Sequence, residues 1–192
     1  RQAAIDASGN YVIVWEDGSG LDGSGNGVYA QRYNASGVAQ GGQFRVNSTT
    51  SDSQNEPQVA MADNGNFVVV WQSQAQDGSN LGVYAQRYNA SGVAQGGEFR
   101  VNSTTSQDQR GPAVAMDSAG NFLVVWQSFN QDVASSWGIY GQRYNASGAT
   151  QGGEFRVNST TANDQTEAAV AMDASGNFVV AWESRYVDGD TS

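Results

Sequence analysis

The chain has 192 residues, a formal net charge of −10 and a pI near 4.1, and it contains neither cysteine nor histidine. Such acidity disfavours nucleic acid and anionic membranes as partners, because both would repel the protein, and no apolar run approaches the ~20 residues that membrane insertion requires. The absent residue types exclude disulfide bonds, zinc sites of the usual kind and catalytic pairs built on His or Cys.

A module of about 55 residues recurs along the chain and indicates an array of one structural unit. The segment from Gly27 to Gly37 recurs unchanged from Gly82 to Gly92 and, with two changes, in the third module. We predict a single repeat domain with modules over approximately 1–55, 56–110 and 111–166 and a partial module over 167–192. The chain opens in the middle of a module, so we expect a fragment or a mature piece.

Each module predicts four antiparallel strands, as the second one illustrates. A short apolar strand over 57–61 is followed by Asn64-Gly65, a strong hairpin signal because both residues tolerate positive φ. The next strand, over 67–71, is apolar on both faces and should be covered on both. A polar loop over 72–81 leads to an alternating strand over 83–88, and the last strand, over 98–102, has one apolar face, as expected of an outer strand.

The predicted fold class is all-β, a β-propeller-like array of four-stranded antiparallel blades with about three and a half modules. Radial repetition of four-stranded sheets is the propeller plan, and small residues in the first strand, such as Ala60 and Ala115, suit a crowded central axis. A parallel solenoid fits tight hairpins less well, and four strands cannot close a sandwich core alone. Three and a half modules do not complete a ring, so we expect a longer parent chain or self-association of two copies.

The module also resembles a known kind of repeat. The segment from Gly65 to Ser73, the Gln76-Asp77-Gly78-Ser79 loop and the segment from Gly82 to Gly92 are similar to tandem repeats of very large secreted bacterial proteins, often found beside calcium-binding RTX-type or cadherin-like regions. The resemblance implies an extracellular or cell-surface location, surroundings rich in calcium, and a structural or adhesive role. It implies no catalytic residue.

Acidic residues offer two readings, metal binding and turn formation. One aspartate lies in the loop after the second strand of each module, beside Gly and Ser residues whose oxygens suit calcium. A lone Asp-Gly, however, also serves as a plain turn. The candidate calcium ligands are Asp22, Asp77, Asp132 and Asp188. Carboxylate pairs of the kind that glycosidases use also remain open, yet the acids recur at equivalent positions, whereas an active site needs a unique constellation.

Aromatic residues could form either core or ligand-binding surfaces. The repeated tryptophans end runs of valine and should fill the space between blades; they are Trp15, Trp71, Trp126 and Trp182. Sugar rings could instead stack on Tyr29, Tyr84, Tyr140 or Trp137, the last of which, with Phe129, departs from the repeat in a predicted loop. The repeated arginines should pair with neighbouring carboxylates. Six Asn-x-Ser/Thr triplets match the glycosylation motif, which matters only in a eukaryotic source.

The leading hypothesis from sequence is a non-enzymatic extracellular scaffold of a bacterial surface or secreted protein. The near identity of the modules favours this role, since residues 27–50 and 82–105 differ only at Gln43 and Glu98. The alternative is a multivalent lectin that binds cell-surface glycans with one weak site per module. A propeller glycosidase is the third hypothesis, and it would require one acid that its equivalents cannot replace.

Overall fold

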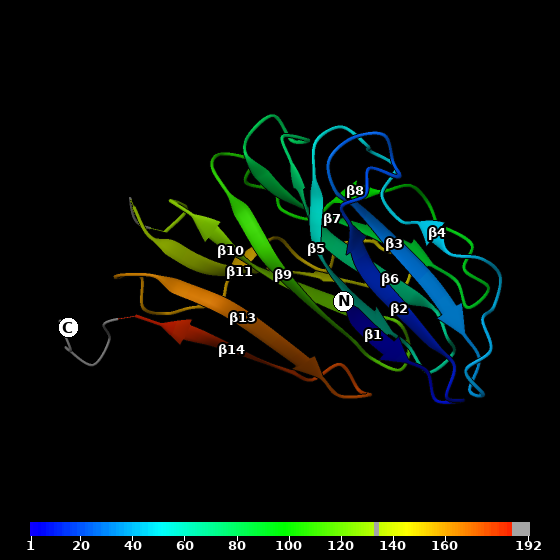
Figure 1. The fold of residues 1–192 in the computed structure, drawn as a ribbon. Helices are drawn as coiled ribbons and strands as arrows, with labels where there is room; N and C mark the ends of the chain where they lie inside the picture. Colours follow the sequence, from blue (N-terminus) through cyan, green and yellow to red (C-terminus); the bar gives the residue numbers. More distant parts are fainter. Residues whose placement is uncertain (133–134, 186–192) are drawn as a thin grey trace.

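The computed structural model describes residues 1–132 and 135–185, and the regular structure in these residues consists of β-strands alone. The strands form three four-stranded antiparallel sheets and one two-stranded sheet, each in chain order (Figure 1). No helix in the described part of the chain has the length and apolar character that crossing a membrane requires. The first sheet contains β1 (Gln2–Ile5), β2 (Tyr11–Asp17), β3 (Gly27–Tyr33) and β4 (Phe44–Arg45); the second contains β5 (Gln54–Met61), β6 (Phe67–Gln74), β7 (Leu81–Tyr88) and β8 (Phe99–Arg100); the third contains β9 (Gln109–Met116), β10 (Phe122–Phe129), β11 (Trp137–Tyr144) and β12 (Phe155–Arg156); the last contains β13 (Gln165–Met172) and β14 (Phe178–Ser184).

Each sheet is one blade, and the blades follow one another around a common side (Figure 1). The first strands of successive blades lie innermost, because β1 contacts β5, β5 contacts β9 and β9 contacts β13. The fourth strands contain only two residues each and lie at the outer edge. The predicted array of four-stranded blades is therefore confirmed, including the position of the alanine-rich strands beside the axis.

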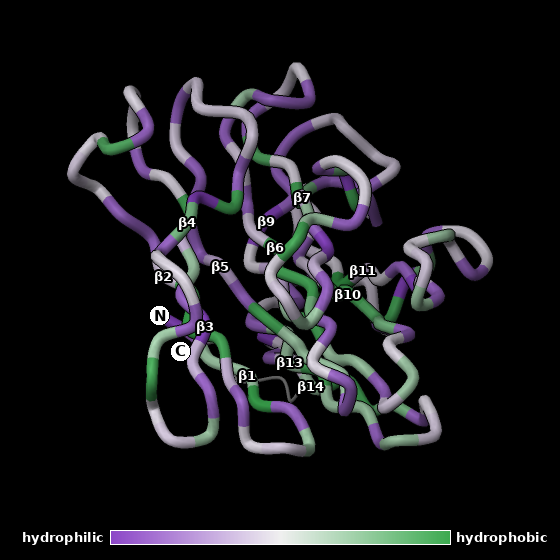
Figure 2. The backbone as a smooth tube through the Cα atoms, turned by 90° about the vertical axis from the view of Figure 1, so that its right-hand side faces the viewer, coloured by the Kyte–Doolittle hydropathy of each residue, from purple (hydrophilic) through white to green (hydrophobic). Residues whose placement is uncertain are grey.

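The hydrophobic core lies between blades rather than within one. Val68 and Val70 of the second blade pack against Phe122, Val124 and Trp126 of the third. The same contact recurs one blade earlier, and the apolar stretches of β6 and β10 run through the interior (Figure 2). The predicted core role of the repeated tryptophans is confirmed at the two inner junctions, where both indole side chains are 0% exposed, at Trp71 and Trp126.

Arginine side chains on the third strands hold neighbouring blades together. Arg32 Nη1 donates to the carbonyl oxygen of Ser91 at 2.7 Å, in the turn after β7 of the next blade. Arg87 repeats the contact with the following blade, donating to the carbonyl oxygens of Ala146, at 3.0 Å, and Ser147. The prediction that the repeated arginines pair with carboxylates was wrong for Arg32 and Arg87, because the turn of the next blade presents backbone oxygens within reach of the guanidinium. Arg156 does pair with a carboxylate, since its Nη1 lies 3.7 Å from Asp132 Oδ1.

Two further contacts recur at the same junctions. The Glu98 carboxylate accepts hydrogen bonds from the backbone N–H of Ser48, at 2.7 Å, and from the Thr49 hydroxyl, at 3.1 Å. Tyr88 donates its hydroxyl to the Val46 carbonyl oxygen at 3.4 Å. The junction between the second and third blades has the same set, contributed by Glu154 and Tyr144. Both of these junctions thus combine an apolar interior with an arginine, a glutamate and a tyrosine contact, here called the junction contacts.

Replacing Arg87 by alanine should lower the free energy of unfolding by about 1 kcal/mol, because two hydrogen bonds to the next blade are lost. Arg143 is the equivalent residue of the third blade, and the described residues give its guanidinium no hydrogen bond or ion pair, so Arg143→Ala should change stability by less than about 0.5 kcal/mol. Urea unfolding followed by tryptophan fluorescence measures both. Equal losses for the two variants would show that the arginines stabilise the fold without the contacts between blades.

Candidate functional site

The inner strands of the second, third and fourth blades enclose a cavity of about 570 Å³ near the starts of β5, β9 and β13. Its wall includes Glu56 from β5, Arg110 and Gly111 from β9, and Glu167 from β13. Each lies one or two residues after the first residue of its strand, where the strand leaves regular pairing with its neighbour. The cavity therefore brings together side chains from three blades.

An unusual backbone conformation places the two glutamates in the cavity wall. Glu56, Gly111 and Glu167 occupy equivalent positions and have φ values of 53°, 60° and 53°. Positive φ costs a non-glycine residue about 1–3 kcal/mol, and such residues cluster at functional sites. Glycine would be the easiest choice at all three positions, yet two of them hold glutamate.

Glu56 is exposed as a residue, yet the protein around its carboxyl group raises the pKa of that group. Burial is the largest cause that raises the pKa of Glu56, and the carboxylates of Glu167 and Glu16 raise it further, whereas Arg110 opposes them. Its backbone N–H donates to Glu16 Oε2 at 3.2 Å, which fixes a second carboxylate beside it. A carboxyl group that holds its proton more tightly than usual suits the role of a general acid.

Two glutamines add polar groups to the cavity. Gln72 Oε1 accepts a hydrogen bond from the Gly111 N–H at 3.2 Å. The equivalent oxygen of Gln127 has no hydrogen-bond partner in the described part of the chain, although the side chain is only 4% exposed and lines the cavity. A buried acceptor without a donor is unfavourable, so this oxygen is available to a ligand hydroxyl group.

Arg110 connects the cavity with an aromatic pair at the end of the third blade. Its guanidinium carbon lies 3.9 Å from the ring centroid of Trp137, a cation–π contact, and the Phe129 ring packs on the same indole at 5.0 Å. Phe129 and Trp137 were predicted to lie in a loop; they instead end β10 and begin β11 as a cross-strand pair. The half-buried indole thus holds the arginine at the cavity rather than standing free.

The starts of the inner strands, which line the cavity, differ between modules. The third strands and the turns after them are nearly identical, whereas the strand starts read Asn-Glu-Pro-Gln over 55–58, Arg-Gly-Pro-Ala over 110–113 and Thr-Glu-Ala-Ala over 166–169. A single asymmetric site thus forms inside a nearly symmetric array. Sequence reasoning missed Glu56, Arg110 and Glu167 because it compared acids in the loops; the signal was the contrast between variable strand starts and invariant third strands.

The tyrosines predicted to contact a ligand lie in the third strands between blades. Tyr29, Tyr84 and Tyr140 are 7%, 6% and 7% exposed, and burial raises the pKa of Tyr84 to about 12. Tyr140 donates its hydroxyl to Asp132. The observed contacts of these rings are structural, and a ligand-binding role for them and for Trp137 stays a prediction. The cavity does not include any of the four.

Asp22, Asp77 and Asp132, three of the aspartates predicted to bind calcium, lie in three different blades. Asp77 Oδ1 accepts from the Ser79 N–H at 3.1 Å, and Asp132 Oδ2 accepts from Asn158 Nδ2 at 2.8 Å. Asp22 occupies the equivalent loop of the first blade and accepts from the Ser24 N–H at 3.3 Å, while Asp188 lies outside the described residues. Within residues 1–132 and 135–185 no three acidic side chains gather as metal ligands, so calcium binding stays a prediction.

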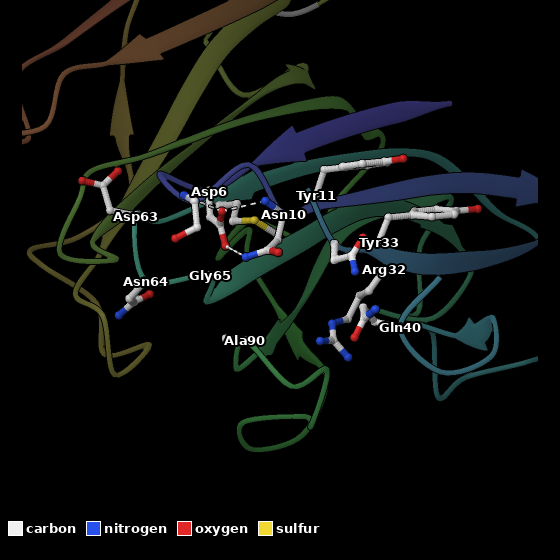
Figure 3. Close-up of a pocket in the computed structure, with 13 residues that line it drawn as sticks. Asp6, Asn10, Tyr11, Arg32, Tyr33, Gln40, Asp63, Asn64, Gly65 and Ala90 are labelled. Atoms are coloured by element: carbon white, nitrogen blue, oxygen red, sulfur yellow. Dashed lines mark hydrogen bonds between the residues drawn. The ribbon is translucent and has the colours of Figure 1, made fainter. Parts of the chain in front are cut away.

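A second hollow, of about 290 Å³, lies between the first two blades at the opposite strand ends (Figure 3). Its side chains are already engaged: Asp6 accepts from Asn10, and Arg32 makes its junction contact. Similar hollows, lined by Arg87 and Arg143, recur at the next two junctions. This repetition assigns the hollow to blade packing. At the inner strand starts, a further hollow of about 440 Å³ beside Glu16 and Glu56 adjoins the cavity.

No family model and no curated protein matches this sequence. Solved structures do match: a protein of unknown function from Dyadobacter fermentans (TM-score 0.68, 9% identity, 97% of this chain and 62% of that chain) and the α-L-arabinanase of Penicillium chrysogenum complexed with arabinobiose (TM-score 0.56, 14% identity, 90% and 53%). A third is the endo-arabinase of Bacteroides thetaiotaomicron (TM-score 0.51, 15% identity, 92% and 66%). The fold is a β-propeller. The chain spans 53–66% of the length of these three proteins.

The propeller comparisons correct the hypothesis of a non-enzymatic scaffold. Structures that share the fold include enzymes that act on arabinose-containing glycans, by their names. The sequence hypothesis assumed that acids repeat symmetrically; the cavity contradicts that assumption, because Gly111 stands where the neighbouring blades have glutamate. The match supports the repeated blades but leaves the resemblance to RTX- or cadherin-associated repeats unconfirmed.

The pKa of Glu56 should respond to its two charged neighbours in opposite directions. Carboxyl-carbon NMR, assigned with Glu56→Gln, should show this group titrating above the ~4.3 of an ordinary glutamate. Arg110→Ala should raise the value further and Glu167→Gln should lower it, because they remove a positive and a negative charge. A raised folded-state pKa also means that Glu56 stabilises the fold at low pH and that this contribution is lost as the pH rises through the raised value. Shifts of the opposite sign would contradict the assignment.

Proposed function

We propose that this propeller is a carbohydrate-active protein that cleaves glycosidic bonds at the mouth of the central cavity. The observation that carries the proposal is the pair of glutamates, Glu56 and Glu167, placed in one cavity by strained backbone positions. Glycoside hydrolysis needs two carboxyl groups with different protonation states, and the surroundings of Glu56 favour the protonated form. The fold shared with arabinanases supports the same reaction class.

In this proposal each residue has a defined role. Glu56 donates its proton to the oxygen of the departing sugar, and Glu167, as carboxylate, activates a water or attacks the anomeric carbon. Gln127 accepts a hydrogen bond from a sugar hydroxyl through its unpartnered oxygen, and Arg110, fixed by Trp137, places positive charge beside both carboxylates. Release of the proton from Glu56 ends its function as an acid, so the rate should fall as the pH rises through its raised pKa.

Binding without cleavage is the second candidate function, that of a lectin. The polar groups of the cavity favour it, because the unpartnered Gln127 oxygen and the Arg110 guanidinium can bind sugar hydroxyl groups without a catalytic acid. We further infer a secreted or cell-surface location, where polysaccharides are encountered; the resemblance to secreted repeats and the acidic composition support it.

Release of reducing ends from arabinan and from a panel of other polysaccharides tests the proposal. Glu56→Gln and Glu167→Gln should each lower kcat at least about 100-fold, because each removes one proton-transfer or charge-stabilising group. Asp63→Asn, which makes the same charge change at an exposed hairpin on the opposite strand ends, should leave the rate unchanged.

Isothermal titration with the same polysaccharides separates the two candidates. If binding requires Arg110 and Gln127 and no turnover is detected, the protein is a lectin and the hydrolase function is wrong. Absence of both binding and turnover across the panel would overturn both functions, and so would variants of Glu56 and Glu167 that behave like Asp63→Asn.

A further inference from the structure

The fourth blade contains two strands and has an open side. β14 pairs with β13, whereas β2, β6 and β10 each pair with a strand on both sides, so one edge of β14 is free in the described part of the chain. Phe178 is 40% exposed, Trp182 36% and Val179 65%, although the equivalents of the first two in the second and third blades are at most 2% exposed. Free edges and exposed aromatic rings together mark a surface where another strand can bind.

On the side that faces the fourth blade, the third blade has the groups that form the junction contacts elsewhere, but the described residues include no partners for them. Arg143 is exposed and its guanidinium has no hydrogen bond among the described residues, whereas the guanidinium groups of Arg32 and Arg87 reach backbone oxygens of the turn after the next third strand. Ser159 and Thr160 are exposed, whereas the equivalent Ser and Thr of the first two blades donate to a glutamate just before the next fourth strand. The three missing partners therefore have known positions in the repeat.

The carbonyl oxygen of Val157 is the last group of this kind, and it lacks a tyrosine donor among the described residues. Its equivalents, in Val46 and Val101, accept from a tyrosine hydroxyl at the end of the next third strand. The side chains of those two valines are 5% exposed, while Val157 is only half-buried. Among residues 1–132 and 135–185, no turn, glutamate, tyrosine or pairing strand fills this place, and all four would belong to the third and fourth strands of one module.

We propose that the open side of the fourth blade binds a β-hairpin that has the third- and fourth-strand sequence of this repeat. Such a hairpin would add to the free edge of β14 by main-chain hydrogen bonds, cover Phe178 and Trp182, and supply the three missing junction contacts. Residues 81–100 of this chain show the required pattern, since Tyr88, the turn after it and Glu98 make these contacts with the first blade. This binding surface is separate from the cavity and does not depend on the proposed reaction.

A synthetic peptide with the sequence of residues 80–103, labelled for fluorescence anisotropy, tests the proposal directly. It should bind the chain saturably, and a scrambled peptide should not. Arg143→Ala should weaken binding at least about tenfold, because it removes charge-assisted hydrogen bonds to the hairpin turn, without lowering the stability of the chain alone. The peptide with Glu98→Gln should bind more weakly for the same reason, and Asp63→Asn should bind like the wild-type chain.

A fusion keeps the test decisive if the isolated peptide aggregates. Residues 80–103 appended after residue 192 through a flexible linker should raise the midpoint of urea unfolding, and Arg143→Ala should remove part of the gain. Absence of both saturable binding and stabilisation, or effects that ignore Arg143 and Glu98, would overturn the proposal. Sedimentation of the chain alone gives the remaining outcome: dimers that the peptide does not dissociate would show that a second copy covers this face differently.

Discussion

The packing of one blade against the next is the constraint on which the structure depends. A four-stranded sheet whose second strand is apolar on both faces cannot bury both of them by itself, so each blade needs a neighbour on either side. Trp71 and Trp126 fill the wedge between blades, and the arginine, glutamate and tyrosine contacts close its rim. Burial supplies most of the stabilisation, while the polar contacts, each worth about 1 kcal/mol, fix how the blades are aligned.

This constraint explains which parts of the module sequence are free to vary. The third strands contribute the arginine and the tyrosine of the junction contacts and are almost identical between modules, whereas the starts of the inner strands face the axis and are free to differ. Glu56, Gly111 and Glu167 share one backbone conformation, so the framework fixes their direction and leaves their chemistry open. The asymmetric cavity is thus a product of a symmetric scaffold, with the strain at two glutamates held by the blades around them.

The all-β class, the four strands per module and the buried tryptophans could be predicted, because period, hairpin signals and apolar runs are local properties of the sequence. The cavity could not, since it depends on which strand starts from different blades meet at the axis. Loop aspartates such as Asp77 were predicted to bind calcium because they repeat, but in the structure their oxygens accept hydrogen bonds from nearby groups. Arg32 was predicted to pair with a carboxylate. The structure shows that it binds a carbonyl oxygen instead, because the turn of the next blade lies beside it.

The near identity of residues 27–50 and 82–105 also has a consequence for how the chain folds. A third strand from one module fits the sheet of another almost as well as its own, so the modules can exchange partners before the native order is reached. The modules differ in the loops between their second and third strands and in the inner strand starts, some of which line the cavity. A substitution in an inner strand start could therefore change the folding yield as well as the chemistry, because it removes one of the sequence differences between blades.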